Sequence, residues 1–189
     1  VLQQLDLRQE ALPFMQELAE ISGETVNLCV LDGHEVVYIE KVEGSSSLRM
    51  FARIGHRAPI YCTGAGKVLL CELSLDEVRS ILRKQGMEPL TPNTITTFKE
   101  FLQALEFVRM HGYAVDEEEC EIGASCLAAP VRDHRGKIVA SLSVSGASVR
   151  LGPERRSELV SQLLRISREL SERLGCRADE FLKTSSSSI

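Results

Sequence analysis

The stretch from residue 112 to residue 146 constrains the fold of this chain more than any other part. Its sequence is GYAVDEEECEIGASCLAAPVRDHRGKIVASLSVSG, in which two long apolar runs flank a polar, glycine-containing turn at 133–136. Two such runs joined by such a turn predict an antiparallel β-hairpin. A shorter run before the acidic residues 116–119 predicts one more strand. The chain is therefore expected to build a sheet around this stretch.

Polar side chains interrupt this otherwise apolar stretch. They are an acid, a thiol and three serines: Asp116, Cys126, Ser141, Ser143 and Ser145. Ser143 and Ser145 are two residues apart, so in a strand their side chains point to the same face. A few polar groups that converge in an apolar surface are typical of ligand sites. We therefore expect this part of the sheet to hold a small polar ligand.

Hydrophobic periodicity and turn residues predict the remaining elements. Helices are expected at residues 3–21 with an interruption at Pro13, at 68–73, from Ser74 onward, at 97–111, and from Gly152-Pro153 onward. Further strands are expected at residues 25–31, 35–42 and 47–54, the first two joined by Asp32-Gly33. The order helix, strands, helices, strands, helix lacks the alternation of single strands with helices that parallel sheets need. This indicates an α+β fold in which helices pack against an antiparallel sheet.

Two local signals define helix ends. Ser74 followed three residues later by Glu77 predicts a capping box at the start of a helix. Gly112 predicts the end of the helix before the hairpin, because glycine readily adopts the left-handed conformation found after helices.

Composition narrows the class of protein. A chain of 189 residues can form one domain with a sizeable core, and no internal repeat or second domain is visible. The net charge of −5 argues against direct DNA contact, which usually needs a basic face. No apolar run approaches the roughly 20 residues that span a membrane, and no secretory signal is visible. The six cysteines contain no CxxC pair, which favours reduced thiols in the cytoplasm.

Four segments together resemble the effector-binding domain of IclR-family transcriptional regulators. They are GETVNLCVLDGHEVVYIEKVEG, RIGHRAPIYCTGAGKVLL, LTPNTIT and the stretch 112–146. The resemblance implies a GAF-like curved antiparallel sheet flanked by helices, and dimers that pair into tetramers. Family members usually carry a winged helix-turn-helix domain before this one, and nothing here matches it. Residues 1–180 are thus expected to be a single effector-binding domain, with 181–189 a disordered tail and DNA bound only through the missing N-terminal domain.

The resemblance also implies a site for a small carboxylic acid. Gly64 and Ala65 would present backbone N–H groups to the carboxylate, while Asp116 and Cys126 would contact the polar end of the effector. Leu48, Met50, Ala58 and Ala124 would form the apolar wall, and Ser143 and Ser145 can add hydroxyl contacts. A nucleotide-binding P-loop is rejected, because Tyr61 and Val68 replace the glycine and the Ser/Thr of that pattern.

Each of these residues also has a simpler interpretation. Gly64 can serve a tight turn, Asp116 can be a solvated turn acid, and Cys126 can be an inert buried thiol. Ser143 and Ser145 can belong to the polar part of an exposed sheet face. The apolar residues can be ordinary core.

The alternative functions are a stand-alone GAF-like enzyme or a metal-binding module acting through Cys126. A nucleophilic Cys126 would need Asp116 and one of the four histidines, His34, His56, His111 or His134, and no local signature supports that. A metal site would draw on Cys126, Asp116, Cys62 or His56, without any close ligand spacing. We therefore expect no catalytic residue, no metal and no cofactor.

The charge balance generates a prediction about DNA. The chain of residues 1–189 should not retard duplex DNA in an electrophoretic assay at about 0.15 M salt, because a net charge of −5 argues against a basic face that would displace counterions. Tight, sequence-specific retardation would contradict the assignment of DNA binding to another domain.

Overall fold

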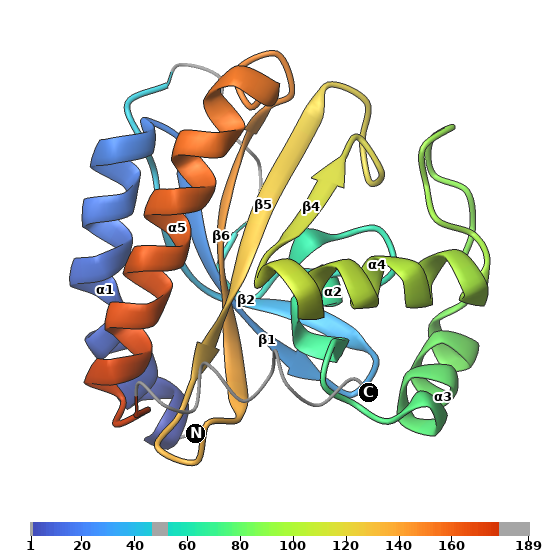
Figure 1. Cartoon of the computed structure of the whole chain (residues 1–189), viewed down its shortest axis with the longest axis horizontal. Helices are drawn as coiled ribbons and strands as arrows, with labels where there is room; N and C mark the ends of the chain where they lie inside the picture. Colours follow the sequence, from blue (N-terminus) through green and yellow to red (C-terminus); the bar gives the residue numbers. More distant parts are fainter. Residues whose placement is uncertain (1, 47–52, 178–189) are drawn as a thin grey trace.

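The computed structural model describes residues 2–46 and 53–177 (Figure 1). The helices are α1 (Leu2–Ser22), α2 (Gly64–Leu70), α3 (Leu75–Gln85), α4 (Phe98–His111) and α5 (Pro153–Arg173). The strands are β1 (Thr25–Asp32), β2 (Glu35–Val42), β3 (Arg57–Ala58), β4 (Ala114–Glu117), β5 (Ala124–Arg132) and β6 (Ile138–Ala147).

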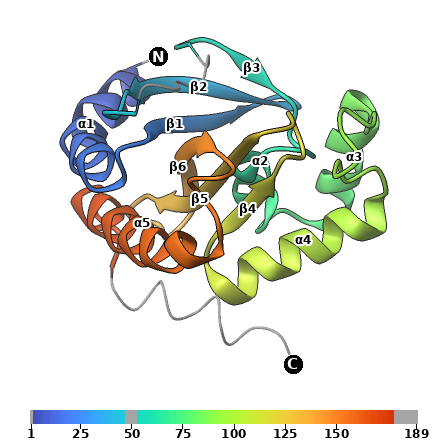
Figure 2. The ribbon, with the colours of Figure 1, turned by 90° about the horizontal axis from the view of Figure 1, so that it is seen from above.

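All six strands form one antiparallel sheet in the order β3-β2-β1-β6-β5-β4. The predicted hairpins β1–β2 and β5–β6 meet where β1 pairs with β6, from Thr25 opposite Ser145 to Cys29 opposite Ser141. Figure 2 shows the sheet curled, with α1 and α5 on one side and α2, α3 and α4 on the other. The predicted α+β class and its curved antiparallel sheet are confirmed.

Helices cover both faces of the sheet, and each face has its own core. Leu28, Leu127 and Leu142 are fully or almost fully buried and pack with α1 and α5. Cys29 and Ala128 are also buried, but they pack with residues of α2 and α4. β1 is mostly apolar on both faces, whereas β6 alternates apolar residues that face α1 and α5 with serines on the other face.

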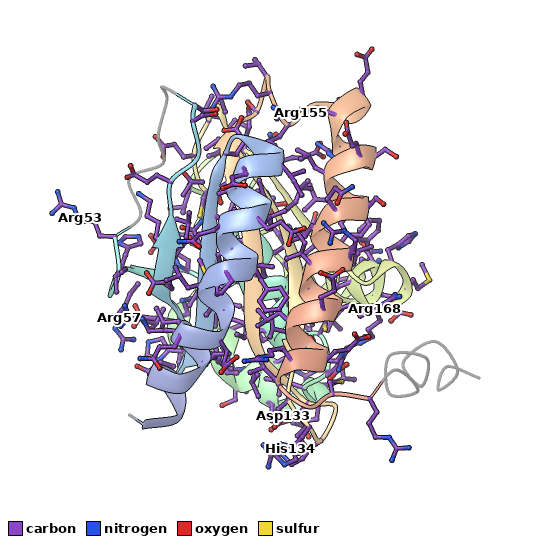
Figure 3. The ribbon with its side chains drawn as sticks, turned by 90° about the vertical axis from the view of Figure 1, so that its left-hand side faces the viewer. Arg53, Arg57, Asp133, His134, Arg155 and Arg168 are labelled. Atoms are coloured by element: carbon purple, nitrogen blue, oxygen red, sulfur yellow. The ribbon has the colours of Figure 1, made fainter. Side chains whose placement is uncertain are left out.

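A buried carboxylate joins the start of β1 to the start of α5. The Glu24 side chain is 1% exposed, and its two oxygens accept from Arg150 at 2.6 and 2.8 Å. Arg155 lies 3.5 Å from the same carboxylate, and Figure 3 shows it at the upper end of α5. Because breaking a buried pair leaves an uncompensated charge, this contact is expected to hold the start of α5 against the start of β1.

The predicted helix ends at Ser74 and Gly112 are confirmed. Ser74 Oγ accepts from the Glu77 backbone N–H, and the Glu77 carboxylate accepts from the Ser74 N–H at 2.9 Å. Gly112 ends α4 with φ 78°. α5 begins at Pro153, as predicted.

The predicted interruption at Pro13 is wrong, because α1 is continuous through that residue. Pro13 is exposed, and so is Leu12, which was expected on the apolar face. Ala11, Met15 and Leu18 form the buried stripe instead. Packing of that stripe on the sheet outweighs the one backbone hydrogen bond that proline removes.

Two other predicted boundaries differ. The short helix predicted at 68–73 begins four residues earlier, at Gly64, because Thr63 caps it by accepting from the Gly66 N–H. The strand predicted at 47–54 falls mostly on residues 47–52, which lie outside the described residues. The strand that pairs with β2 on that side is β3. The predicted tail 181–189 also lies outside the described residues.

The start of α2 depends on the absence of a side chain at Gly66. A Cβ atom there would lie 2.2 Å from the Ile60 carbonyl oxygen, and Ile60 belongs to the turn that leads into the helix. Backbone cannot withdraw as a flexible side chain can. Gly66 therefore lets the turn and the helix approach each other.

This contact predicts the outcome of a pair of substitutions. Gly66→Ala should lower the free energy of unfolding by on the order of 3 kcal/mol, measured by urea denaturation. The control is Gly64→Ala, whose Cβ would meet the Ala128 Cβ at 3.3 Å, a contact that small movements relieve. Equal losses for the two variants would contradict the proposed role of Gly66.

Candidate functional site

A cavity of about 350 Å³ lies between the sheet and the start of α2. Its floor comes from β1, β2, β5 and β6, and its walls come from the turn before α2 and from the loop between β4 and β5. The lining residues are Asn27, Tyr38, His56, Ala58, Pro59, Thr63, Gly64, Ala65, Asp116, Cys120, Glu121, Ala124, Ser125, Cys126, Ser143 and Ser145.

Strand register gathers the polar side chains on one face. Asp116 pairs with Cys126, and Cys126 pairs with Ser145 on the next strand. Two residues before Ser145 on the same strand, Ser143 pairs with Asn27 of β1. Side chains opposite each other in neighbouring strands lie on the same face, so these five residues form one polar patch.

The structure brings the described members of the predicted site together. Gly64, Ala65, Asp116, Cys126, Ala58, Ala124, Ser143 and Ser145 all line the cavity. Leu48 and Met50 lie outside the described residues. Contact of any of these residues with a ligand stays a prediction.

Several lining residues were not anticipated from the sequence. Asn27 could have been predicted to have a special role, since it is a single polar residue between Val26 and Leu28 in an apolar strand. Thr63 could also have been predicted, because threonine before a glycine-rich helix start is a typical capping residue. Tyr38 had no such signal, and His56 was considered only for the alternative catalytic or metal site. Their rings, 5.6 Å apart between centroids, come from β2 and from the segment before β3.

The start of α2 presents peptide groups to the cavity. Thr63 Oγ1 accepts from the Gly66 N–H at 3.1 Å and donates to the Pro59 carbonyl at 2.7 Å. The Gly64 and Ala65 N–H groups occupy the first helical positions, which have no acceptor within the helix. Gly64 lies close to β5, where a Cβ would be 3.5 Å from the Cys126 sulfur. Small residues thus let the helix start face the polar patch.

Asp116 is a buried acid at the edge of this patch. Its Oδ1 accepts from the Glu119 N–H at 2.8 Å, and its side chain lines the cavity. Burial raises the pKa of Asp116 from its ordinary value of 3.8 to about 7, although the hydrogen bond from Glu119 opposes this. Near neutral pH both the protonated and the ionised forms of this carboxyl are therefore populated.

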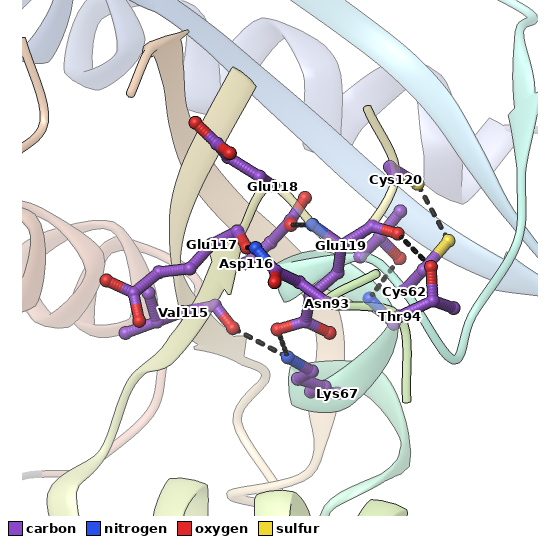
Figure 4. A network of polar contacts seen from close by, with 12 residues as sticks. Cys62, Lys67, Asn93, Thr94, Val115, Asp116, Glu117, Glu118, Glu119 and Cys120 are labelled. Carbon is purple, nitrogen blue, oxygen red and sulfur yellow. Dashed lines mark hydrogen bonds and ion pairs between the residues drawn. The ribbon is translucent and has the colours of Figure 1, made fainter. Parts of the chain in front are cut away.

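Lys67 of α2 binds the acidic segment around residues 115–119 (Figure 4). Its Nζ is 2.5 Å from Glu119 Oε1 and 2.7 Å from the Val115 carbonyl, and the lysine is 3% exposed. Thr91 and Thr94 bind the carbonyls of Glu118 and Glu119 from a neighbouring loop. Because Lys67 is committed to these acceptors, its geometry gives no support to phosphate binding.

One polar atom beside the cavity lacks a partner. The Asn27 amide donates to Ser145 Oγ at 3.3 Å, while its Oδ1 is buried and has no hydrogen bond among the described residues. If the amide were turned over, its nitrogen would be left instead. Asn27 therefore keeps one polar atom that a bound molecule can satisfy.

The thiol of Cys126 lacks the features of an activated nucleophile. Burial and the nearby Asp116 raise its pKa to about 12, so the thiol is neutral at physiological pH.

Among residues 2–46 and 53–177, no group of three or more His, Cys, Asp and Glu side chains is arranged to hold a metal ion. Over the same residues, no helix combines the length and the hydropathy required to cross a bilayer.

The buried Asp116 predicts a pH dependence of stability. Between pH 4 and 7 the folded state binds more protons than the unfolded chain, so the free energy of unfolding should fall as pH rises through about 7. The loss is at most about 4 kcal/mol. Asp116→Asn should remove this slope in urea denaturation between pH 5 and 8, whereas the exposed Asp76→Asn should keep it. A slope that survives in Asp116→Asn would show that another group titrates.

Sequence comparison identifies relatives of the chain. The family profile for the bacterial transcriptional regulator IclR C-terminal region matches residues 1–172. The HTH-type transcriptional regulator KdgR of Escherichia coli K12 is 41% identical over 174 residues, covering 92% of this chain and 66% of KdgR. The HTH-type transcriptional repressor AllR of the same strain is 40% identical over 176 residues, covering 92% of this chain and 64% of AllR. The chain thus spans slightly less than two thirds of these curated relatives.

Solved structures agree in fold. The Thermotoga maritima IclR structure superposes with a TM-score of 0.84 at 38% identity, covering 89% of this chain and 68% of that one. The inducer-binding domain of PobR from Acinetobacter, a double mutant in complex with 3-hydroxybenzoic acid, gives a TM-score of 0.80 at 30% identity. It covers 87% of this chain and 97% of the PobR chain. This chain therefore belongs to the IclR family of bacterial transcriptional regulators and corresponds to that family's C-terminal region.

Proposed function

We propose that this chain is the effector-binding part of a transcriptional regulator, and that a small hydroxy- or oxo-carboxylic acid binds in the cavity beside α2. The observation that carries this proposal is the chemical asymmetry of the cavity. One side offers backbone N–H donors at Gly64 and Ala65, and the opposite side offers hydroxyl, amide and carboxyl groups. A molecule with a carboxylate at one end and a hydroxyl or carbonyl near it matches both sides.

The polar side of the cavity favours a ligand that donates a hydrogen bond. The free polar atom of Asn27 is an acceptor as its amide is oriented, and Ser143 and Ser145 can donate or accept. Asp116 in its neutral form can donate to the ligand, which avoids placing two negative charges together. A purely apolar ligand would leave these groups unsatisfied at a cost of about 1–3 kcal/mol each.

Size and lining limit the ligand to a small molecule. A volume of about 350 Å³ lies at the lower end of ligand cavities in proteins. Ala58, Ala124 and the Tyr38 ring supply an apolar side, to which Leu48 and Met50 remain candidates to contribute. The 3-hydroxybenzoic acid in the PobR complex is a compound of this class and supports the choice.

An effector can regulate DNA binding only if the full-length protein has two arrangements and the effector binds them with different affinity. We propose that the second arrangement changes the spacing of DNA-binding domains carried elsewhere in the full-length regulator. We also propose that the chain associates into homodimers or homotetramers and acts in the cytoplasm. The alternative of an enzyme or metal module acting through Cys126 gains no support, since the relatives are named transcriptional regulators and the thiol is not activated.

Ligand binding is tested by thermal shift and calorimetry with small hydroxy- and oxo-carboxylates, 3-hydroxybenzoate included, against their primary amides. At least one acid should stabilise the chain, and its amide should bind at least tenfold more weakly because the anion contacts are lost. Asp116→Ala and Cys126→Ala should each weaken binding by about tenfold, while the distant Asp76→Asn should not. If no acid stabilises the chain, or if the acids and amides bind equally, the proposal fails.

The same titration has a predicted pH dependence. Above pH 7 Asp116 becomes anionic and repels a carboxylate ligand, so the affinity should fall by up to about tenfold for each further pH unit. The Asp116→Asn variant should show constant affinity between pH 6 and 8.5. Affinity that rises with pH in the unmodified chain would contradict the proposed repulsion between ionised Asp116 and the anionic ligand.

A further inference from the structure

We propose that Cys62 and Cys120 are a thiol pair that a hydroperoxide converts into a reversible intrachain disulfide at the wall of the cavity. The two residues are 58 positions apart in the chain, and their sulfur atoms lie 2.7 Å from each other (Figure 4). This proposal stands independently of which effector the cavity binds.

The distance is the first argument. A disulfide bond has a sulfur–sulfur length of about 2.05 Å, so the two atoms need to approach by only about 0.7 Å. Both side chains come from segments without regular structure, the turn before α2 and the loop between β4 and β5. The short remaining approach is therefore expected to come from these two segments.

Access is the second argument. Cys62 is fully buried, whereas Cys120 is partly exposed and lines the cavity, which opens to solvent. Cys29, Cys71 and Cys176 are buried away from this opening. A small oxidant that enters the cavity therefore meets Cys120 with its resolving partner directly behind it. Cys126 also lines the cavity, but its sulfur contacts the Leu127 carbonyl at 3.7 Å rather than another thiol.

The reaction balances in two steps. Cys120 loses its proton, and its sulfur attacks one peroxide oxygen, which breaks the O–O bond and gives a sulfenic acid and one water or alcohol. The Cys62 sulfur then attacks the sulfenic sulfur, loses its proton and displaces the hydroxyl as a second water. Two thiols are oxidised by two electrons, and the peroxide is reduced. A small dithiol reverses the reaction by exchange.

The surroundings make the first step slow. The hydrogen bond with Cys62, burial, and the nearby Asp116 and Glu119 carboxyls all raise the pKa of Cys120. The thiolate is therefore scarce at neutral pH, and the pair should respond to sustained rather than brief exposure to oxidant.

The bond would tie together two walls of the same cavity. Thr63, Gly64 and Ala65 follow Cys62 directly, and Glu121 follows Cys120. Lys67 and Glu119 already join these segments through one ion pair, next to the thiols. A covalent link at this point would hold the segments together when that ion pair opens.

The test uses the whole chain treated with hydrogen peroxide for about an hour, then blocked with an alkylating reagent and measured by intact mass. Wild-type protein should lose about 2 Da, withhold two thiols from alkylation and recover both after dithiothreitol. Digestion without reductant should yield one peptide pair that joins the segments around Cys62 and Cys120. The oxidised protein should also show a higher melting temperature than the reduced protein.

Substitutions provide the control. Cys62→Ser and Cys120→Ser should each abolish the 2 Da loss, and Cys71→Ala should retain it. Two results would overturn the proposal: oxygen addition at Cys120 without a cross-link, or a cross-link of Cys120 to Cys126 in place of Cys62. The peptide map of the wild-type chain decides between these outcomes even if a variant fails to fold.

Discussion

The antiparallel pairing of β1 with β6 is the constraint on which the rest of the structure depends. It joins a hairpin from the start of the chain to a hairpin from its end, with residues 25–29 opposite residues 141–145. Without it the chain would hold two small sheets, each with an exposed edge and half a core. The same pairing brings α1 and α5 side by side on one face (Figure 1). The Glu24 carboxylate, bound by Arg150, then fixes the junction between these halves.

The pairing also assembles the polar patch at a cost in stability. It sets Asn27 against Ser143, and it leaves polar atoms of Asn27 and Ser141 buried without a partner among the described residues. Asp116 adds an acid whose burial disfavours its charged form. The opposite face of β1 and β6 carries Val26, Leu28, Leu142 and Val144, which pack with α1 and α5. That face stabilises the sheet, and the sheet can therefore tolerate polar groups facing the cavity.

The cavity combines a floor of paired strands with walls made of loops that side-chain contacts hold in place. The floor is paired strand, whereas the walls are the turn before α2 and the loop after β4. Lys67 and Glu119 join these walls through a buried ion pair, and Cys62 and Cys120 touch beside it.

The sequence by itself determined the local elements and part of the site. Turn glycines, helix caps and apolar spacing act over a few residues, so the β1–β2 hairpin, the Ser74 cap and the end of α4 at Gly112 were predictable. The period of a strand likewise put Ser143 and Ser145 on one face. Asp116 and Cys126 already stood out as polar residues in an apolar stretch. The expected effector contacts of these two residues and of Gly64 and Ala65 came from resemblance to a family, since no local rule joins residues so far apart.

Only the tertiary structure decided what depends on packing and on distant contacts. α1 runs through Pro13 because its buried stripe packs on the sheet, and α2 starts at Gly64 because Thr63 and the Ile60 turn fit against it. Asn27 meets Ser145 across 118 positions, and Cys62 meets Cys120 across 58. The pattern of neighbours along a chain carries no record of such contacts, because they arise from the register and curvature of the whole sheet.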